Sequence, residues 1–514
     1  MRSKEDSNNS SNEKRRLHTS LHENIRKVKE AVGNSSDIVI RELYIGQEAI
    51  KVAILYTDGL ADSKSVNNFI LESIMLNTYP GDSVSHFSHS NPIQMLKDHA
   101  LAVGEVKDVN DIQTLLTAIL AGDTAIMIDG YSQCIIVGLR GWEHRGVTEP
   151  ATQNVIRGPR DAFTETLRIN TALIRRRIKD PNLWLETKPI GRVTKTDVAM
   201  MYIKGIANDK IVEEVQRRID RIDIDGILES AYIEELIQDE TFTPFPTMSN
   251  TERPDVVAAA LLEGRIAILV DGTPFVLLVP SLFTQYFQAA EDYYQRSDLG
   301  LIRTLRYLSF FIALLAPSLY IAITTFHQEM LPTQLLISLA AQREGVPFPA
   351  VVEGFLMEVT FEILREAGVR MPKAIGQAVS IVGALVIGQA AVEAGFISAA
   401  MVIVVSITAI ASFVFPSYNM AISVRILRFI FMVLGATYGL FGITVGLFLL
   451  VLHLTSLRSF GVPYMSPFAP FIPSDQKDAI LRFPLWAMFS RPHFTSQKNI
   501  IRQKEAQESK PRKE

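Results

Sequence analysis

The sequence predicts an α/β soluble N-terminal region of two tandem repeated subdomains, followed by an all-α multi-pass membrane domain. Two observations lead to this fold class. Charged residues make up 21% of the 514 residues, yet long stretches contain no Asp, Glu, Lys or Arg: 307–328, 374–392, 394–424 and 429–457. Secondly, two segments of the N-terminal half recur further along the chain. The uncharged stretches exclude a purely soluble protein, since each is about as long as a bilayer-crossing helix.

The repeat begins in the first strand-like segment. Residues 52–66 align without gaps onto 198–212, and residues 118–137 align onto 260–279. Each copy opens with a strand, continues through helix-patterned sequence and closes with a helix and two strands. An Asp-Gly pair separates the last two strands of each copy, which is a strong hairpin signal.

These patterns divide the chain into six regions. We expect, in order, a disordered polar tail, α/β subdomain 1, an Arg-rich connector, α/β subdomain 2, a transmembrane domain and a cytoplasmic C-terminal tail. Their predicted bounds are 1–34, 35–140, 141–182, 183–290, 300–456 and 457–514.

Four membrane spans are expected: 307–326, 374–392, 396–415 and 429–454. The first is uncharged over a length that matches a hydrocarbon core of about 30 Å. Basic residues flank its start, as the positive-inside rule expects for a cytoplasmic flank. Since the polar start of the chain lacks a secretory signal, the N-terminal domain is expected on the cytoplasmic side. Four spans would place Arg425 and Arg428 in a loop on the opposite side.

The segment 349–367 is apolar but carries several charges. On a helical wheel Glu358, Glu362 and Arg365 fall on one side, and apolar residues such as Leu356 fall on another. One interpretation is a helix at the membrane interface or under the bundle, with Glu362 and Arg365 paired. In the other interpretation Glu358 and Glu362 line an aqueous vestibule that attracts cations. The segment could then be a fifth, partial span.

Small residues predict how the spans pack. In the last span four glycines share one face, which favours close approach of another helix: Gly435, Gly439, Gly442 and Gly446. In the second span a weakly polar stripe forms either a packing seam or the lining of a narrow pore: Gln377, Ser380, Ala384 and Gly388.

The region between the repeats is strongly basic. Its arginines include Arg157, Arg160, Arg175, Arg176 and Arg177. They form either a solvated helix face or a surface for anionic lipid headgroups or an acidic neighbouring subunit.

Nothing in the sequence points to catalysis. The phosphate-binding, hydrolase and zinc-protease motifs are absent, and the single cysteine, Cys134, excludes an intramolecular disulfide and a multi-cysteine metal site. We therefore expect no enzyme activity and no catalytic, cofactor or metal residues. The net charge of −4 argues against general nucleic-acid binding.

Three strings resemble a known family. They are the connector RGPRDAFTETLRINTALIRRRI, the turn LVDGTPFVLLVP, and the membrane run PFPAVVEGFLMEVTFEILREAG followed by SIVGALVIGQAAVEAG. Together they resemble the A-subunit of bacterial spore germinant receptors, the GerA family. The resemblance covers roughly residues 35–490, and its one noted departure is Ile169, where a threonine is expected.

The resemblance implies a location and partners. Members of the family reside in the spore inner membrane with the N-terminal domain facing the core. They assemble with a transporter-like B-subunit and a lipoprotein C-subunit. The A-subunit is expected to oligomerise as an ion channel that opens on nutrient binding and starts germination. The stripe is then our candidate for the pore, and Glu358 and Glu362 for the vestibule.

Two alternatives stay open. The chain could be a family paralogue associated with the SpoVA machinery that releases dipicolinic acid. It could also be a transporter that couples a solute to protons through Glu358 or Glu362, although the spans lack the inverted repeat and broken helices typical of transporters.

Overall fold

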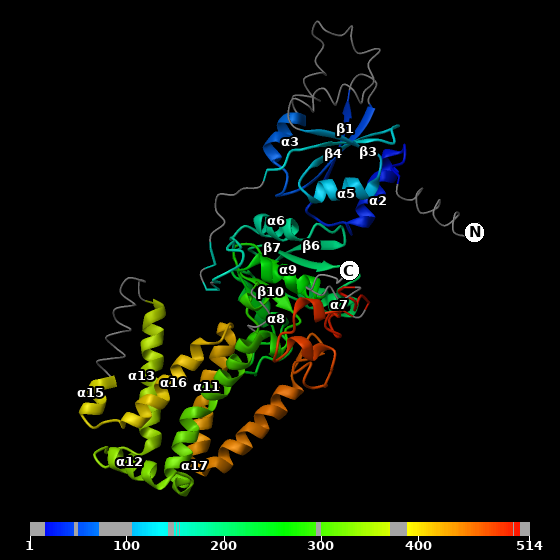
Figure 1. The fold of residues 1–514 in the computed structure, drawn as a ribbon. Helices are drawn as coiled ribbons and strands as arrows, with labels where there is room; N and C mark the ends of the chain where they lie inside the picture. Colours follow the sequence, from blue (N-terminus) through cyan, green and yellow to red (C-terminus); the bar gives the residue numbers. More distant parts are fainter. Residues whose placement is uncertain are drawn as a thin grey trace, which may run out of the picture. The chain divides into compact units, whose positions relative to one another are not determined.

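The computed structural model describes residues 16–45, 50–70, 105–141, 149–150, 152–153, 155–294, 300–370, 388–496 and 498–503. These residues form two compact units. The α/β unit contains the described residues of 1–238, 248–280 and 491–502, and the helical unit contains those of 239–247, 281–490 and 503 onward. The first is built on two sheets and the second on long helices (Figure 1).

The first sheet has the strand order β1, β2, β4, β5, β3, and all neighbouring strands are antiparallel. Helices α2 and α5 bury their apolar sides against one face of it, and α3 covers the other. The elements are α2 Leu21–Ala31, β1 Ile38–Ile45, β2 Ile50–Thr57, α3 Ser63–Ile70, β3 Val106–Val109, α5 Ile112–Leu120, β4 Thr124–Ile128 and β5 Cys134–Val137.

The second sheet has the equivalent order, β6, β7, β9, β10, β8, again antiparallel throughout. Helices α6 and α9 pack on one face. The elements are α6 Leu167–Arg177, β6 Leu183–Ile190, β7 Thr196–Ile203, α7 Asp209–Asp220, α8 Ser230–Ile237, β8 Ser249–Thr251, α9 Pro254–Leu262, β9 Ile266–Val270 and β10 Val276–Val279. Both Asp-Gly segments form the expected hairpins, between β4 and β5 and between β9 and β10.

Helices α2 and α6 occupy equivalent places before the two sheets. Asn24 accepts a hydrogen bond from the amide of His18 and donates one to its carbonyl, at 2.8 and 2.6 Å. Asn170 makes the same pair of bonds with Thr164, at 2.8 and 2.6 Å. The aspartate of each Asp-Gly turn accepts the first amide of its helix, Leu21 or Leu167. One helix therefore precedes each sheet, and both helices lie before the segments that align in the sequence.

The positions of α2 and α6 show that two predicted boundaries are wrong. The expected tail 1–34 includes α2, whose Leu21, Ile25 and Val28 are buried in the first core. The expected connector 141–182 includes α6, whose Leu173 and Ile174 are buried in the second. Both segments look polar because only one side of each helix is apolar.

The C-terminal region also differs from the predicted free tail 457–514. Residues 491–502 belong to the α/β unit, where Arg491 donates to the carbonyl of Leu262 at 2.9 Å and Thr495 donates to that of Glu263 at 2.7 Å. Residues up to 490 belong to the helical unit, in which Tyr464 is buried.

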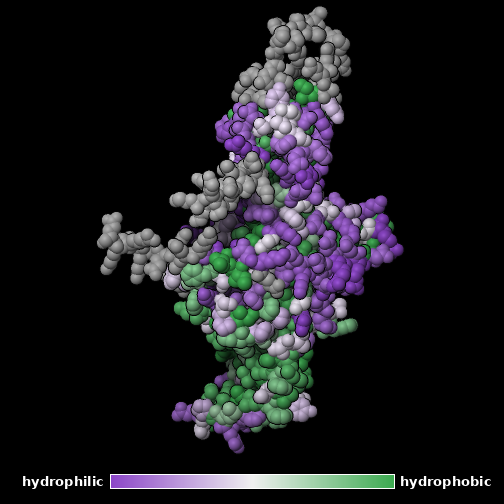
Figure 2. All heavy atoms as spheres, turned by 90° about the vertical axis from the view of Figure 1, so that its right-hand side faces the viewer, coloured by the Kyte–Doolittle hydropathy of each residue, from purple (hydrophilic) through white to green (hydrophobic). Residues whose placement is uncertain are grey.

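The helical unit contains two helices long and apolar enough to cross a membrane, α11 and α17, among the residues described. Helix α16 is apolar but shorter. Exposed apolar side chains cover much of this unit, whereas the α/β unit is largely hydrophilic outside (Figure 2). The helices are α10 Glu291–Tyr294, α11 Gly300–Phe326, α12 Thr333–Arg343, α13 Ala350–Arg370, α15 Gly388–Glu393, α16 Ala399–Phe413 and α17 Tyr418–Ser456, with a short hairpin of β11 Arg458–Ser459 and β12 Val462–Pro463. Short 3-10 turns cover Phe283–Phe287, Gln328–Met330, Asp475–Asp478 and Leu485–Ala487.

Helix α17 is not the straight span expected at 429–454. The backbone of Gly439 is non-helical, with φ 62° and ψ −144°, so the element consists of two helices joined at that residue. Ser423 in the first half donates to the carbonyl of Pro244, and His453 in the second half lies 2.9 Å from the hydroxyl of the adjacent Thr243. Both ends of α17 therefore meet the same short segment, which requires the chain to double back at Gly439.

Candidate functional site: a buried charge cluster on α13

Helix α13 presents its charges inward and its apolar residues outward. Glu353 and Glu358 are buried against neighbouring helices, while Leu356, Val359 and Ile363 are exposed. A soluble amphipathic helix shows the opposite arrangement. Its neighbours α11 and α16 lie beside it in the same unit (Figure 1).

The deepest contact joins Glu358 to Arg428 in the first half of α17. Both side chains are at most 1% exposed. The Nη1 of Arg428 donates to Oε2 of Glu358. Within the described part of the chain, Oε1 of Glu358 and the Nε and Nη2 of Arg428 have no hydrogen-bond partner. The pair is thus fully desolvated but only partly bonded, and such pairs contribute little net stability.

One turn further along α13, Glu362 binds two arginines. Its Oε2 accepts Nη1 of Arg425 at 2.9 Å, and its Oε1 accepts Nη1 of Arg365 at 3.1 Å. Arg365 also donates to the hydroxyl of Ser412 on α16, at 3.1 Å. The expected pair of Glu362 and Arg365 is therefore present, and α17 and α16 extend it into a network.

At the other end of α13, Glu353 caps a helix. Its Oε2 accepts the amide of Ser398, the N-cap of α16, at 2.9 Å. Its Oε1 lies 3.5 Å from Nε of Arg343, the last residue of α12. Glu353, Glu358 and Glu362 therefore connect α13 to three other helices.

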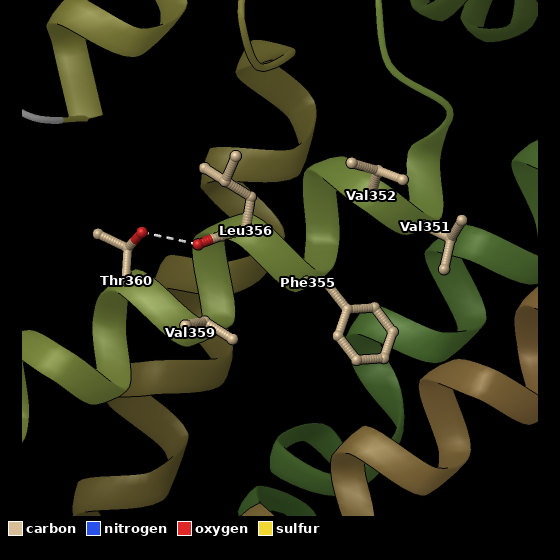
Figure 3. Close-up of a pocket in the computed structure, with 6 residues that line it drawn as sticks. All are labelled: Val351, Val352, Phe355, Leu356, Val359 and Thr360. Carbon is tan, nitrogen blue, oxygen red and sulfur yellow. Dashed lines mark hydrogen bonds between the residues drawn. The ribbon is translucent and has the colours of Figure 1, made fainter.

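The outer side of α13 forms an open apolar hollow of about 430 Å³ (Figure 3). Its lining consists of Val351, Val352, Phe355, Leu356, Val359 and Thr360. The hydroxyl of Thr360 donates to the carbonyl of Leu356 at 2.7 Å, so its polarity is satisfied within the helix. This side of the helix suits an apolar environment.

A second ion cluster holds the start of α11. Asp292 on α10 accepts hydrogen bonds from Arg303 and Arg306, and Arg303 also binds Asp478 at 2.8 Å. Burial alone would raise the pKa of Asp292, but the hydrogen bond and positive charge of Arg306, together with Arg303, lower it below its ordinary value. The two arginines expected to flank the first span are thus internal ion-pair partners.

The predicted pore stripe is only partly visible. Gln377, Ser380 and Ala384, like most of the expected span 374–392, lie outside the described residues. Gly388 is the first residue of α15, and a Cβ atom there would meet no atom of the described residues within 4 Å.

The four glycines of α17 are all buried, but they serve different contacts. A Cβ at Gly435 would lie 2.7 Å from the carbonyl oxygen of Ser318 on α11, which is the close helix approach that was predicted. A Cβ atom at Gly442 or Gly446 would instead meet Leu434, which lies in the first half of α17, because α17 doubles back.

The basic residues of the predicted connector 141–182 do not form one surface. Arg175 is completely buried in an ion pair with Asp37. Arg177 binds Asp161 at 2.7 Å, while Arg157, Arg160 and Arg176 are exposed. A common lipid-binding face that includes Arg175 is therefore excluded.

The partners of Glu358 and Glu362 were not predicted from the sequence. Arg425 and Arg428 were expected in an outside loop, yet both lie within α17 and bind α13. Their spacing of one helical turn matched that of Glu358 and Glu362, and this was the available signal. Among the described residues no cluster of three His, Cys, Asp or Glu side chains could hold a metal ion.

Comparison with known proteins identifies the family. The family model described as Bacillus/Clostridium GerA spore germination protein matches residues 26–494. Spore germination protein KA of Bacillus subtilis (strain 168) is 53% identical, over 96% of this chain and 90% of that protein. The uncharacterized membrane protein YfkQ of the same strain is 45% identical, over 95% and 94% of the two chains. GerLA of Bacillus cereus is 39% identical, over 95% and 98%.

A solved structure is also similar. It is the crystal structure of the N-terminal domain of the A subunit of the Bacillus megaterium spore germinant receptor GerK3. The identity is 43%, the match covers 52% of this chain and 97% of that one, and the TM-score is 0.42. The family match over nearly the whole sequence confirms the resemblance seen in the sequence strings, and the chain belongs to the GerA family of spore germination proteins.

Proposed function

We propose that this chain is the A-subunit of a nutrient germinant receptor in the spore inner membrane, where it oligomerises as an ion channel that opens on nutrient binding and triggers germination. The observation that carries the proposal is that helix α13 buries charged side chains and exposes apolar ones. Ionisable groups at membrane depth usually face a cavity or one another rather than lipid. Glu358 is fully buried within a helical unit whose exposed side chains include many large apolar ones that suit lipid.

The course of the helices supports several membrane crossings. Helix α11 would cross once, and the turn at Gly439 would divide α17 into two further crossings. With α13, the segment 374–392 and α16, six crossings would return the chain to its starting side. The shared contacts of Ser423 and His453 with residues 243–244 agree with this arrangement, because the two ends of α17 then lie on one side. We place the α/β unit on the cytoplasmic, core-facing side.

The two sheets also support a tandem repeat. Their identical strand order, the equivalent Asn24 and Asn170 contacts and the capping by Asp129 and Asp271 are all expected of two copies of one unit. We infer that this region serves as a scaffold or sensor. Its proposed partners are further A-subunits, a transporter-like B-subunit and a lipoprotein C-subunit. Co-purification of such a B-subunit would distinguish a receptor from the paralogue associated with SpoVA.

The proposed pore is the stripe Gln377, Ser380, Ala384 and Gly388, and the proposed vestibule contains Glu358 and Glu362. In this structure both glutamates are paired with arginines, so a vestibule that attracts cations requires those pairs to open or exchange.

Enlarging Gly388 tests the pore. Because no atom of the described residues lies within 4 Å of its Cβ position, Gly388→Leu leaves their packing intact but would narrow a pore lined by this face. We expect loss of nutrient-triggered potassium release, measured with a cation electrode on spores that carry the variant. The matched control is Gly345→Leu, also in open space, which should release ions normally. Normal release from both variants would contradict the pore assignment.

A second candidate, a proton-coupled transporter, is favoured only by the buried carboxylate of Glu358. Reconstitution into liposomes separates the two functions. Saturable solute uptake would contradict the channel, and ion current without solute movement would contradict the transporter.

A further inference from the structure

Two ladders of opposite charge face each other between α13 and α17. Helix α13 carries Glu358, Glu362 and Glu366 at successive turns, and the first half of α17 carries Arg425 and Arg428, spaced by about one turn. The helices are antiparallel here, since Glu358 binds Arg428 and Glu362 binds Arg425. Two of these three carboxylates bind the two arginines, and among the described residues the third has no arginine partner on α17.

The surplus carboxylate is Glu366. Its side chain is 63% exposed and binds Arg370 of the same helix. Within the described part of the chain it forms no ion pair with α17 in the present register. The two ion pairs between α13 and α17 leave several buried polar atoms without a hydrogen bond. Among the described residues these atoms are Oε1 of Glu358, Nε and Nη2 of Arg428 and Nε of Arg425. A low-dielectric site gives such groups a strong preference for any arrangement that bonds them better.

We propose that α13 has a second register on α17, displaced by one helical turn, in which Glu362 binds Arg428 and Glu366 binds Arg425. The displacement is about 5 Å along the helix axis. Both arginines keep a carboxylate partner throughout. Such one-turn shifts between packed helices give two discrete states rather than a continuous motion.

The surroundings of α13 accommodate this displacement. Its exposed side is apolar along Val352, Leu356, Val359 and Ile363, so lipid contacts of this stretch are similar in both registers. Gly354 has no side chain, and a Cβ atom there would lie 3.1, 3.2 and 3.4 Å from the side-chain ends of Met432, Ile321 and Met401, so these ends have to shift when a larger residue takes its place. In the second register Glu358 takes the place of Gly354, next to the present position of Glu353, which binds Arg343 in this structure. The main costs of the shift are the contacts it breaks: Glu358 leaves Arg428, Arg365 leaves Ser412, and Glu353 leaves the amide of Ser398.

Cysteine cross-linking of the full-length chain in spore membranes distinguishes the registers. The rings of Phe355 and Phe429 lie 5.7 Å apart, so Phe355→Cys with Phe429→Cys reports the present register. Val359, one turn further along α13, takes the place of Phe355 after the shift. Val359→Cys with Phe429→Cys therefore reports the second register. Cys134→Ala first removes the natural cysteine, which is buried in the α/β unit.

The charge variants give opposite expectations. Glu366→Gln removes a partner used only in the second register, so the cross-link at Val359 should fall about tenfold while that at Phe355 persists. Glu358→Gln weakens the present register and should increase the cross-link at Val359 by a similar factor. Arg370→Gln, which removes the present partner of Glu366, should leave the cross-link at Val359 in place.

Two results would overturn the proposal. One is the failure of the Val359 cross-link to form in every background while the Phe355 cross-link forms, which also demonstrates folding. The other is a Val359 cross-link that Glu366→Gln leaves unchanged, or one that forms no more readily than the Ile363→Cys, Phe429→Cys pair two turns away. The register change does not rest on the proposed channel, because cross-linking detects it without any ion flux.

Discussion

Two buried arginines, one in each unit, are paired in contrasting ways. Arg175 in the α/β unit binds both oxygens of Asp37, at 2.7 and 2.9 Å, and donates to the carbonyl of Leu183 at 2.7 Å. Arg428 in the helical unit makes a single hydrogen bond among the described residues, to Glu358. Both side chains are at most 1% exposed, so both have lost their hydration.

The difference shows what each pair can do. A bidentate pair with a further carbonyl acceptor recovers much of the cost of dehydration and fixes one geometry. A single bond leaves donors and an acceptor unused, so other arrangements of the same groups have similar free energies. We therefore regard Arg175 as a fixed link between α6 and the start of β1, and Arg428 as an exchangeable contact.

Breaking the fixed link should have the largest effect. Asp37→Ala leaves the Arg175 charge buried without a counter-charge, which should destabilise the α/β unit by about 3–5 kcal/mol. Hydrogen exchange of β1 and β7 in the full-length protein measures the loss.

The control is to replace both charges at once. Asp37→Leu with Arg175→Met should recover part of the stability, although the carbonyl of Leu183 loses its donor. The corresponding double change, Glu358→Leu with Arg428→Met, leaves no such acceptor behind and should be neutral or stabilising. Equal losses of stability in both double variants would contradict the distinction between a fixed pair at Arg175 and an exchangeable pair at Arg428.

The backbone of the two units offers a second contrast. Gly272, in a turn of the α/β unit, has φ 93° and open space around its Cβ position. Gly439, in the turn of α17, has φ 62°, and a Cβ there would lie 2.7 Å from Cε1 of His327. We expect Gly439→Ala to cost about 2–3 kcal/mol, from strain and crowding together, and Gly272→Ala only about 1 kcal/mol from strain. Thermal unfolding in detergent gives the difference, and equal costs would show that the turn has room for a side chain.

A smaller, pH-dependent effect concerns Glu234 on α8. Burial, and then the negative charge of Glu229, raise the pKa of Glu234 to about 7. The unfolded chain has a value of about 4.3, so the folded state binds the extra proton between these values and its stability falls as the pH rises from 4.3 to 7. Glu234→Gln should remove this dependence and stabilise the α/β unit at pH 8 by about 1–2 kcal/mol, with no gain at pH 4.

The measurement is hydrogen exchange of β9 at both pH values. The neighbouring Glu235 is exposed and supplies the control, because Glu235→Gln should change neither value. A gain from Glu234→Gln that is the same at pH 4 and pH 8 would mean that the carboxylate is not the cause.

Much of the fold was predictable from local patterns. Asp129-Gly130 and Asp271-Gly272 form the expected hairpins because turn chemistry acts over a few residues. Helix α2 was not predicted, because its many charged residues made the segment resemble a polar tail. A helix was considered in the basic region that contains α6, but its burial in the second core was not, because the arginines made the region resemble a solvated connector. The turn within α17 was missed because its glycines also fit a straight packing helix.

The candidate site was only half predictable. The inward and outward sides of α13 follow from helical periodicity, which placed Glu358 and Glu362 apart from the apolar residues. Their partners did not follow, because Arg428 is 70 residues from Glu358 and Arg425 is 63 from Glu362.

The sequence by itself determined which segments are apolar, where the hairpins turn, and that the chain resembles the GerA family. Hydrophobicity and turn propensity are properties of short segments, so they can be read without the fold. Only the tertiary structure decided that Arg175 is buried, that α17 doubles back at Gly439, and that Arg425 and Arg428 bind α13. Whether a charge is solvated or paired depends on which helices pack together, and that is a property of the whole chain.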